Sequence, residues 1–196
     1  GLGRAEIKAT TPDGRSATCY VHVVRKGIDV SSWQYGINWN SVKQSGVDFA
    51  IIRTGYGGES WAEQTDKYFE ANYNGAKANG IKVGVYHFSY ATTVDMAVQE
   101  AQMCLNILNG RSLDYPVYID IEDHSQLSLP NDLLCEIITT FCNIIESSGY
   151  KAGIYSSPNV YNSKLSSSSL DKYEKWVAHW GVDTPRYYKP FGVWQF

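Results

Sequence analysis

The sequence has few charged residues and no run of either sign. Charged residues make up 19% of its 196 residues, and the formal net charge is −3. Proteins that bind nucleic acid normally present a basic patch or stripe, so we expect no nucleic-acid partner. No stretch of roughly 18 apolar residues occurs, and we therefore expect no insertion into a membrane. The first residues also lack a signal-peptide pattern, and we interpret the chain as beginning partway through a domain.

Cysteine is scarce as well. The four cysteines form no Cys-x-x-Cys pair, which argues against a zinc site or a thioredoxin-like redox motif. We accordingly expect neither a metal nor a cofactor. Cys104, Cys135 and Cys142 lie in apolar helical patterns, which favours buried free thiols that act as small hydrophobic residues. A disulfide from Cys104 to Cys135 or Cys142 is the alternative.

Aromatic residues, in contrast, are abundant. Hydrophobic residues make up 43% of the chain and aromatic residues 14%, so the sequence can bury a core and does not resemble a disordered segment. Many Tyr and Trp side chains suit a packed core, and they equally suit a cleft that stacks on the flat faces of sugar rings. Composition does not choose between the two.

Residues 1–24 differ from the rest. A Thr-Pro-Asp-Gly turn at 11–14 separates two short stretches, and in the second Ser16, Thr18, Tyr20 and His22 alternate with the apolar residues Ala17, Cys19, Val21 and Val23. This pattern predicts a short N-terminal β-hairpin with one buried face, too small to fold alone. The segment resembles the tail of a bacterial immunoglobulin-like (group 2) domain. Alternatively, the hairpin belongs to the main domain.

From residue 25 to 196, apolar strand-like runs alternate with helical patterns. The predicted helices cover residues 66–79, 94–108 and 131–148, and each is followed by a glycine that can end it. Repeated βα units with Val- and Ile-rich strands indicate a parallel sheet covered by helices. We expect an irregular TIM-like (β/α) barrel whose helical second half is reduced. A doubly wound sheet is the alternative, but no glycine-rich phosphate loop follows a strand. The predicted strands are 27–31, 49–54, 81–88, 117–121, 152–155, 176–180 and 192–196.

The run 117–122 is the most informative stretch, because it ends in Asp120-Ile121-Glu122. Side chains alternate between the two faces of a strand, so Asp120 and Glu122 should face the barrel interior together with Tyr118. The strand places them at its carboxyl end, where barrel enzymes carry their active sites. The residues expected to face the helices are Val117, Ile119 and Ile121.

Two carboxylates this close favour acid–base chemistry. Their Cα atoms should lie roughly 6.6 Å apart along the strand, and one pKa should rise because both groups cannot ionise freely. A protonated Glu can then donate to a leaving oxygen while an ionised Asp stabilises positive charge on a sugar carbon. The structural alternative is a pair that holds Arg53 or a metal.

Asp29 follows the same logic on the first strand, since it alternates with Ile28 and Val30 and should face inward. Its structural alternative is a cap for the following segment. Arg53 would lower the pKa of a neighbouring carboxylate if it faces inward. We interpret His87 and His179 as packing or hydrogen-bonding residues.

Several of these stretches together resemble the glycoside hydrolase family 25 muramidases. They occur in the order of that family and cover nearly all of residues 27–196, which makes the combination highly specific. They are Gly27-Ile28-Asp29-Val30-Ser31-Ser32-Trp33-Gln34, Phe49-Ala50-Ile51-Ile52-Arg53-Thr54-Gly55-Tyr56-Gly57, Gly84-Val85-Tyr86-His87-Phe88, Asp120-Ile121-Glu122, Gly153-Ile154-Tyr155 and Trp194-Gln195.

The resemblance implies an incomplete (β/α) barrel that cleaves the β-1,4 bond between N-acetylmuramic acid and N-acetylglucosamine in peptidoglycan. It implies that Glu122 is the general acid, with Asp120 and Asp29 as supporting carboxylates. Whether Asp120 attacks the sugar or steadies an N-acetyl-assisted intermediate is left open. The residues that it implies for substrate binding are Tyr86, Tyr118, Tyr155, Trp180 and Gln195.

One departure concerns the end of the chain. The family continues past its Trp-Gln motif with a loop that carries a further Asp, whereas this sequence ends at Phe196. Either a segment follows this sequence or the protein lacks it, and Asp183 cannot simply take that role. We expect a monomer located outside the cell or at the cell surface, with peptidoglycan glycan strands as its partner. The alternatives are a non-catalytic barrel that binds cell-wall glycan and a chitinase-like glycosidase.

Overall fold

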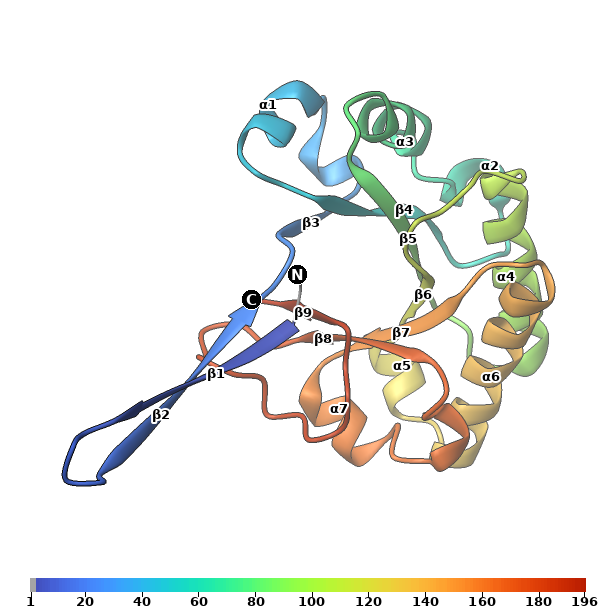
Figure 1. Ribbon diagram of the computed structural model, residues 1–196. Helices are drawn as coiled ribbons and strands as arrows, with labels where there is room; N and C mark the ends of the chain where they lie inside the picture. Colours follow the sequence, from blue (N-terminus) through green and yellow to red (C-terminus); the bar gives the residue numbers. More distant parts are fainter. Residues whose placement is uncertain (1–2) are drawn as a thin grey trace.

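The computed structural model describes residues 3–196 and contains two parts, a curled parallel sheet and a separate antiparallel hairpin (Figure 1). The sheet has seven strands in sequence order, and every neighbouring pair is parallel. All seven predicted strands are confirmed, with ends shifted by one or two residues. The strands are β3 (Gly27–Val30), β4 (Phe49–Tyr56), β5 (Lys82–Phe88), β6 (Val117–Asp120), β7 (Ala152–Ser156), β8 (Glu174–Ala178) and β9 (Val193–Gln195).

The helices lie on the outer side of this curled sheet (Figure 1). The three predicted helices are confirmed as α3 (Phe69–Ala78), α4 (Val94–Leu108) and α6 (Asn131–Ser147). Between β7 and β8 the chain forms only a six-residue helix and one 3-10 turn, and β8 reaches β9 through a loop. The remaining helical segments are α1 (Trp39–Gln44), α2 (Trp61–Gln64), α5 (His124–Leu127), α7 (Pro158–Ser163), η1 (Ser32–Gln34) and η2 (Ser168–Leu170).

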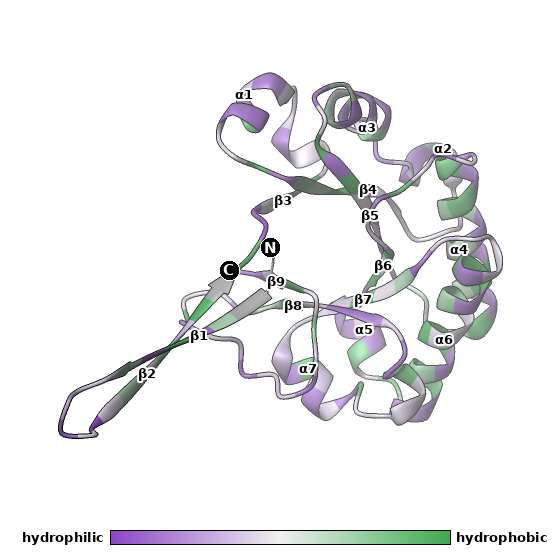
Figure 2. Ribbon diagram, in the orientation of Figure 1, coloured by the Kyte–Doolittle hydropathy of each residue, from purple (hydrophilic) through white to green (hydrophobic). Residues whose placement is uncertain are grey.

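Strand β6 shows the predicted alternation of faces. Val117, Ile119 and Ile121 are fully buried in the large hydrophobic cluster that also contains the inner faces of α4 and α6. Burial of an aliphatic side chain of this kind stabilises the folded protein by about 1.5–3 kcal/mol relative to an exposed side chain. Figure 2 shows hydrophobic and hydrophilic residues mixed along the strands of the sheet and along α4 and α6, in keeping with this alternation. The outer layer therefore anchors the strand that carries Asp120.

The interior of the curled sheet is filled by aromatic side chains. The Trp176 ring lies 4.5 Å from Tyr155, 5.3 Å from Tyr118 and 6.0 Å from Tyr86, measured between ring centroids. Edge-to-face contacts at these distances are favourable beyond the area that they bury. The aromatic residues thus form a solid floor below the carboxyl ends of the strands, as expected for a packed barrel interior.

Cys104, Cys135 and Cys142 are buried free thiols, which confirms the favoured interpretation over a disulfide. His87 is also buried, and its ring nitrogens contact the Thr54 hydroxyl at 3.0 Å and the Gly57 carbonyl at 2.7 Å. Burial lowers its pKa to about 4, so this histidine is neutral. Within the part of the chain that the structure describes, no helix has both the length and the apolar character needed to cross a membrane.

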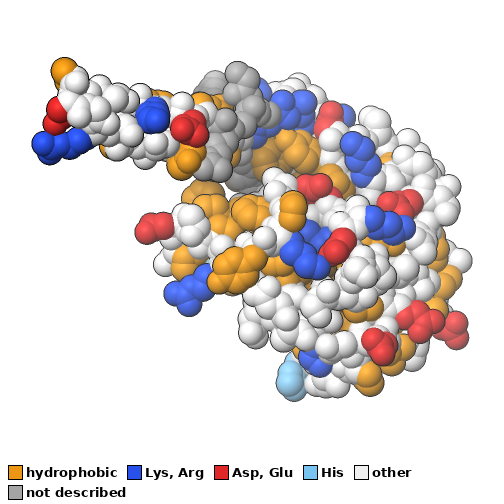
Figure 3. Space-filling model, turned by 60° about the horizontal axis from the view of Figure 1, so that its bottom comes forward, with side chains coloured by type: hydrophobic (Ala, Val, Ile, Leu, Met, Phe, Trp, Pro, Cys, Tyr) orange, Lys and Arg blue, Asp and Glu red, His pale blue; other side chains and the backbone are white. Residues whose placement is uncertain are grey.

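The hairpin consists of β1 (Gly3–Thr10) and β2 (Ser16–Val23) and projects away from the rest of the molecule, as the ribbon of Figure 1 and the space-filling view of Figure 3 show. Residues 1 and 2 of the predicted segment lie outside the described residues, as does the side chain of His22. The prediction of a hairpin is confirmed, but the prediction of a buried face is wrong for this structure. Ala17, Cys19, Val21 and Val23 are all exposed, because two strands alone have no second layer to cover them.

Gly153 offers a test of how tightly the aromatic floor is packed. A Cβ atom at this position of β7 would lie 2.5 Å from Cδ1 and Cε1 of Tyr118. We expect Gly153→Ala to lower the free energy of unfolding by about 1–3 kcal/mol, because the Tyr118 ring must move within a filled interior. Urea unfolding measures the loss. Gly36→Ala is the control, since no atom lies within 4 Å of its Cβ, and an equal loss in both variants would contradict a packed floor.

Candidate active site

The polar side chains of three separate strands meet at the carboxyl edge of the sheet. Gln195 on β9 donates a hydrogen bond from Nε2 to Oδ2 of Asp29 on β3, at 2.9 Å. The Tyr155 hydroxyl on β7 donates to Oε1 of the same Gln195 at 2.8 Å. Side chains of the first and last strands of the sheet are therefore in direct contact, and the predicted residues Asp29, Tyr155 and Gln195 lie together.

Asp120 occupies the most buried polar position of this group. Its side chain is 4% exposed, and Oδ1 has no hydrogen-bond partner. Burial raises the pKa of this carboxyl well above its ordinary value, and the charges of Glu122 and Asp29 raise it further, while Arg53 opposes the shift. A buried carboxylate oxygen without a partner is costly, so Asp120 is poised to interact with a group that enters the site.

Glu122 lies just beyond β6 and is exposed to solvent. Its pKa is also raised, chiefly because neighbouring groups displace water from the carboxyl, and the charge of Asp29 adds to the shift. A hydrogen bond with Tyr155 opposes it. The two carboxyls of this strand end thus differ in environment: Asp120 is enclosed, whereas Glu122 is accessible to an incoming molecule.

Arg53 faces the interior, as do Phe49 and Ile51 on the same strand, but its ion pair is with a residue that the sequence did not single out. Its Nε donates to Oδ2 of Asp66 at 2.8 Å, and Nη2 donates to the Ser32 hydroxyl at 2.9 Å. The backbone amide of Ser32 also donates to Oδ2 of Asp66, at 2.8 Å. The Asp120–Glu122 pair therefore does not serve to hold Arg53. An inward-facing arginine needs a nearby counter-ion. This requirement could have predicted from the sequence that a carboxylate such as Asp66 pairs with Arg53.

Two of the predicted substrate-binding aromatic residues lie in very different places. Tyr118 is fully buried between Trp176 and Gly153, and its hydroxyl has no hydrogen-bond partner. It belongs to the floor and presents no surface to a ligand in this structure. Trp180 follows β8 and is 58% exposed. Tyr86 is partly buried in the interior, and this burial raises its pKa; the charge of Arg53 opposes the shift, and the charges of Asp120 and Asp29 add to it.

A further aromatic cluster at the ends of β4 and β5 was missed by sequence reasoning. The Tyr90 ring lies 5.1 Å from Phe88 and 6.3 Å from Tyr56, again between centroids. Tyr90 is 40% exposed, and Phe88 pairs in register with Asp120. The cluster flanks the carboxylates on the β5 side. Tyr90 follows the predicted strand in a loop, where periodicity gives no information on orientation.

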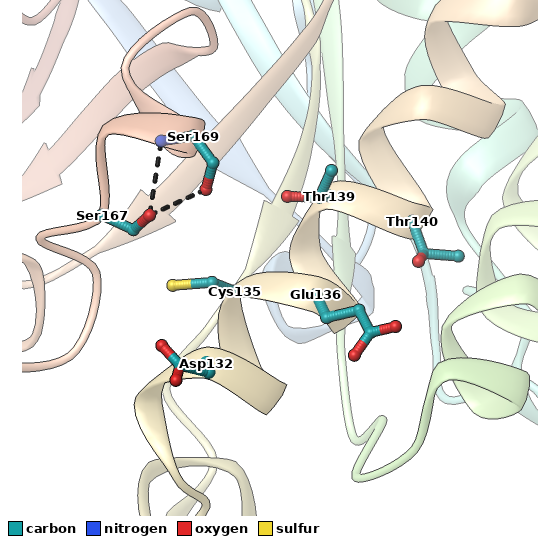
Figure 4. A pocket seen from close by; sticks show the side chains of 7 residues that line it. All are labelled: Asp132, Cys135, Glu136, Thr139, Thr140, Ser167 and Ser169. Atoms are coloured by element: carbon teal, nitrogen blue, oxygen red, sulfur yellow. Dashed lines mark hydrogen bonds between the residues drawn. The ribbon is translucent and has the colours of Figure 1, made fainter.

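No metal site accompanies these carboxylates: across residues 3–196, no three His, Cys, Asp or Glu side chains are arranged to hold an ion. A surface hollow elsewhere on the molecule is lined by residues of α6 and of the segment around η2 (Figure 4). It lies on the helical side of the sheet, and none of the predicted site residues lines it. The lining residues are Asp132, Cys135, Glu136, Thr139, Thr140, Ser167 and Ser169.

The Arg53–Asp66 ion pair yields a stability prediction. The Asp66 side chain is inaccessible to solvent, and that of Arg53 is 13% exposed. We expect Arg53→Gln to lower the free energy of unfolding by about 3–5 kcal/mol, because it leaves a buried carboxylate without its cation. In the double variant Arg53→Gln/Asp66→Asn, the loss should be clearly smaller than the sum of the two single losses. Additive losses in urea unfolding would show that the pair is not coupled.

Comparisons with known proteins agree with the geometry of this edge. Residues 28–196 match the family described as Glycosyl hydrolases family 25. The autolytic lysozyme of Clostridium acetobutylicum is 32% identical over 160 residues, covering 82% of this chain and 46% of that protein. Lysozyme M1 of Streptomyces globisporus is 34% identical over 182 residues, covering 87% of this chain and 60% of that protein. The chain thus spans 46–60% of the length of these two relatives.

A solved structure supports the same assignment. The crystal structure of the bacterial lysozyme from Streptomyces coelicolor matches with a TM-score of 0.75 and 32% sequence identity, covering 88% of this chain and 82% of that one. The sequence match covers all seven strands of the curled sheet except Gly27, the first residue of β3, and the fold match includes most of the chain. The chain therefore belongs to glycosyl hydrolase family 25.

Proposed function

We propose that this protein hydrolyses the β-1,4 bond between N-acetylmuramic acid and N-acetylglucosamine in peptidoglycan. The observation that carries the proposal is the unpartnered, buried oxygen of Asp120 beside the accessible carboxyl of Glu122. A site that only binds glycan has no need for such a costly arrangement. The relatives named as lysozymes support the same activity.

Glu122 is the proposed general acid. Its raised pKa favours the protonated form at higher pH than an ordinary Glu allows, and its exposure lets it reach the glycosidic oxygen. The charge of Glu122 raises the pKa of Asp120, so the pair is best regarded as sharing one proton. When Glu122 holds that proton, Asp120 is the ionised partner. Burial of Asp120 opposes this state, whereas the charge of Arg53 favours it.

Asp120 then stabilises the positive charge that develops on the sugar carbon. It does so either by attacking that carbon or by steadying an intermediate formed by the N-acetyl group of the substrate. Asp29, held by Gln195, is the proposed third carboxylate. Tyr86, Tyr155, Trp180 and Gln195 are proposed to bind substrate, whereas we now assign Tyr118 to the support below them, since it is fully buried.

We also infer the wider organisation of the molecule. Residues 25–196 are interpreted as an irregular TIM-like barrel with a reduced helical second half, consistent with the short α7 and the loop before β9. Residues 1–24 are interpreted as the tail of a bacterial immunoglobulin-like (group 2) domain. On the hairpin, Ile7 pairs with Cys19 and Ala5 with Val21, which gives an exposed apolar face that further strands could cover. We propose a monomer that acts outside the cell or at its surface.

The activity is tested with Glu122→Gln. We expect the clearing of purified peptidoglycan to slow by about 10²-fold or more, because the amide cannot donate the proton to the leaving oxygen. Glu136→Gln, the same change at an exposed position of α6, should retain the wild-type rate. Mass analysis of the products should find N-acetylmuramic acid at the new reducing end. An inert wild-type protein that still binds glycan would refute the enzyme proposal, and N-acetylglucosamine at that end would point to a different bond.

The assignment of the hairpin is tested through the Cys19 thiol, which is exposed here. In residues 1–196 this thiol should react with a thiol reagent at nearly the rate of the unfolded chain, while the three buried thiols react slowly. In the intact gene product, Cys19 should be protected by the remaining strands of the proposed domain. Equally fast labelling of Cys19 in both proteins would contradict the assignment.

A further inference from the structure

Helix α4 contains a buried carboxylate, Glu100, that the proposed mechanism does not use. Its side chain is 1% exposed, and none of the ion pairs among the described residues includes it. Burial raises its pKa to about 7. A carboxyl group at such a position is costly unless it is fully hydrogen bonded, so its partners indicate what it holds in place.

The partners are consecutive residues directly after β5. The Ser89 hydroxyl donates to Oε2 of Glu100 at 2.6 Å, and the Tyr90 amide donates to Oε1 at 2.8 Å. The Ala91 amide in turn donates to the Ser89 hydroxyl oxygen at 3.2 Å. The turn at residues 89–91 is therefore wrapped around the Glu100 carboxyl, with Ser89 and Ala91 completely buried.

The same turn is bonded to the segment that carries the catalytic pair. Nε2 of Gln126, a fully buried residue of α5, donates to the Ser89 hydroxyl oxygen at 2.9 Å and to the Ala91 carbonyl at 3.1 Å. Helix α5 begins two residues after Glu122. The Ser89 amide also donates to the Asp120 carbonyl at 3.1 Å. One buried network thus joins α4, the turn after β5 and both sides of Glu122.

The network sets the spacing of two groups at the mouth of the site. On one side it holds the Tyr90 backbone, whose ring packs against Phe88 and Tyr56. On the other side it holds α5 and thereby the short segment that joins Glu122 to α5. Both carboxylate oxygens of Glu100 accept hydrogen bonds. A side-chain amide in its place would therefore point its NH2 group at one of the two donors.

We propose that Glu100 is a positioning residue of the glycosidase site, which fixes the turn at residues 89–91 and helix α5 so that Tyr90 and Glu122 keep a constant spacing. It acts through Ser89 and Gln126 and does not itself touch the substrate. The inference rests on the proposed function and adds to it a residue on the helical layer, outside the strand ends where the other proposed site residues lie.

The test compares Glu100→Gln with Glu136→Gln, which removes the same charge at an exposed position. We expect kcat on soluble peptidoglycan fragments to fall by about tenfold in Glu100→Gln, since small displacements of a catalytic group can cost up to about 10²-fold. The alkaline limb of the kcat profile, which reports protonated Glu122, should move to lower pH. The charged and titratable groups that interact with Glu122 are Asp29, Asp120 and Tyr155. Its raised pKa depends chiefly on the exclusion of water from the carboxyl, and a looser α5 would readmit that water.

A second variant guards against a failure of Glu100→Gln to fold. Gln126→Leu cuts only the connection to α5 and leaves the Glu100 carboxyl with its donors on the turn. It should reproduce the loss of kcat and the shift of the alkaline limb. Amide hydrogen exchange should at the same time be faster in α5 of both variants than in Glu136→Gln.

Two results would overturn the proposal. Folded variants with a wild-type kcat and an unchanged alkaline limb, but a lower melting temperature, would make Glu100 a purely structural residue. Unchanged exchange of α5 would refute the mechanical connection whatever the activity. An inert wild-type protein is a different outcome, because it refutes the proposed hydrolysis, and the inference about catalytic positioning fails with it.

Discussion

Strand β6 has to satisfy two environments at once, because alternate side chains of a strand point to opposite faces. Its outward residues Val117 and Ile119, and Ile121 directly after it, are completely buried against the helices. Its inward residues lead from the aromatic floor at Tyr118 to the carboxyl of Asp120. The apolar half of the strand stabilises the position of its polar half, and every proposed step of the chemistry depends on that alternation.

The carboxyl edge of the sheet brings three carboxylates near one another, Asp120 and Glu122 from the end of β6 and Asp29 from β3, and the charge of Arg53 opposes theirs at Asp120. Burial and the charges of Glu122 and Asp29 raise the pKa of Asp120, whereas Arg53 lowers it, and the charge of Asp29 also adds to the raised pKa of Glu122. Arg53 can act in this way because Asp66 and Ser32 hold its guanidinium at a fixed place on β4. The electrostatic character of the site is thus set by an ion pair that would not itself contact the sugar carbon.

The remaining contacts bring together ends of the chain that are distant in sequence. Gln195 and Asp29 join the last strand to the first, and Tyr155 extends the connection to β7. The buried network of Glu100, Ser89 and Gln126 does the same for the turn after β5 and helix α5. Both networks lie at the carboxyl edge, where loops of different strands meet and where backbone hydrogen bonding of the sheet has ended.

The sequence by itself determined the strands, the long helices and the inward direction of Asp120, Glu122 and Asp29, because these follow from local periodicity. It also predicted the buried free thiols, since apolar helical spacing implies burial. Only the tertiary structure decided the partner of Arg53, the hydrogen-bond partners of Glu100 and the exposure of the apolar face on the hairpin. Those depend on which segments meet in space: Asp66 is 13 residues from Arg53 and Gln126 is 37 from Ser89, separations over which no periodic pattern extends. Tyr118 shows the limit of the sequence prediction. The alternation of side chains along the strand correctly predicted that Tyr118 faces inward, whereas its depth below the mouth of the site follows from the packing of Trp176 and Gly153 around it.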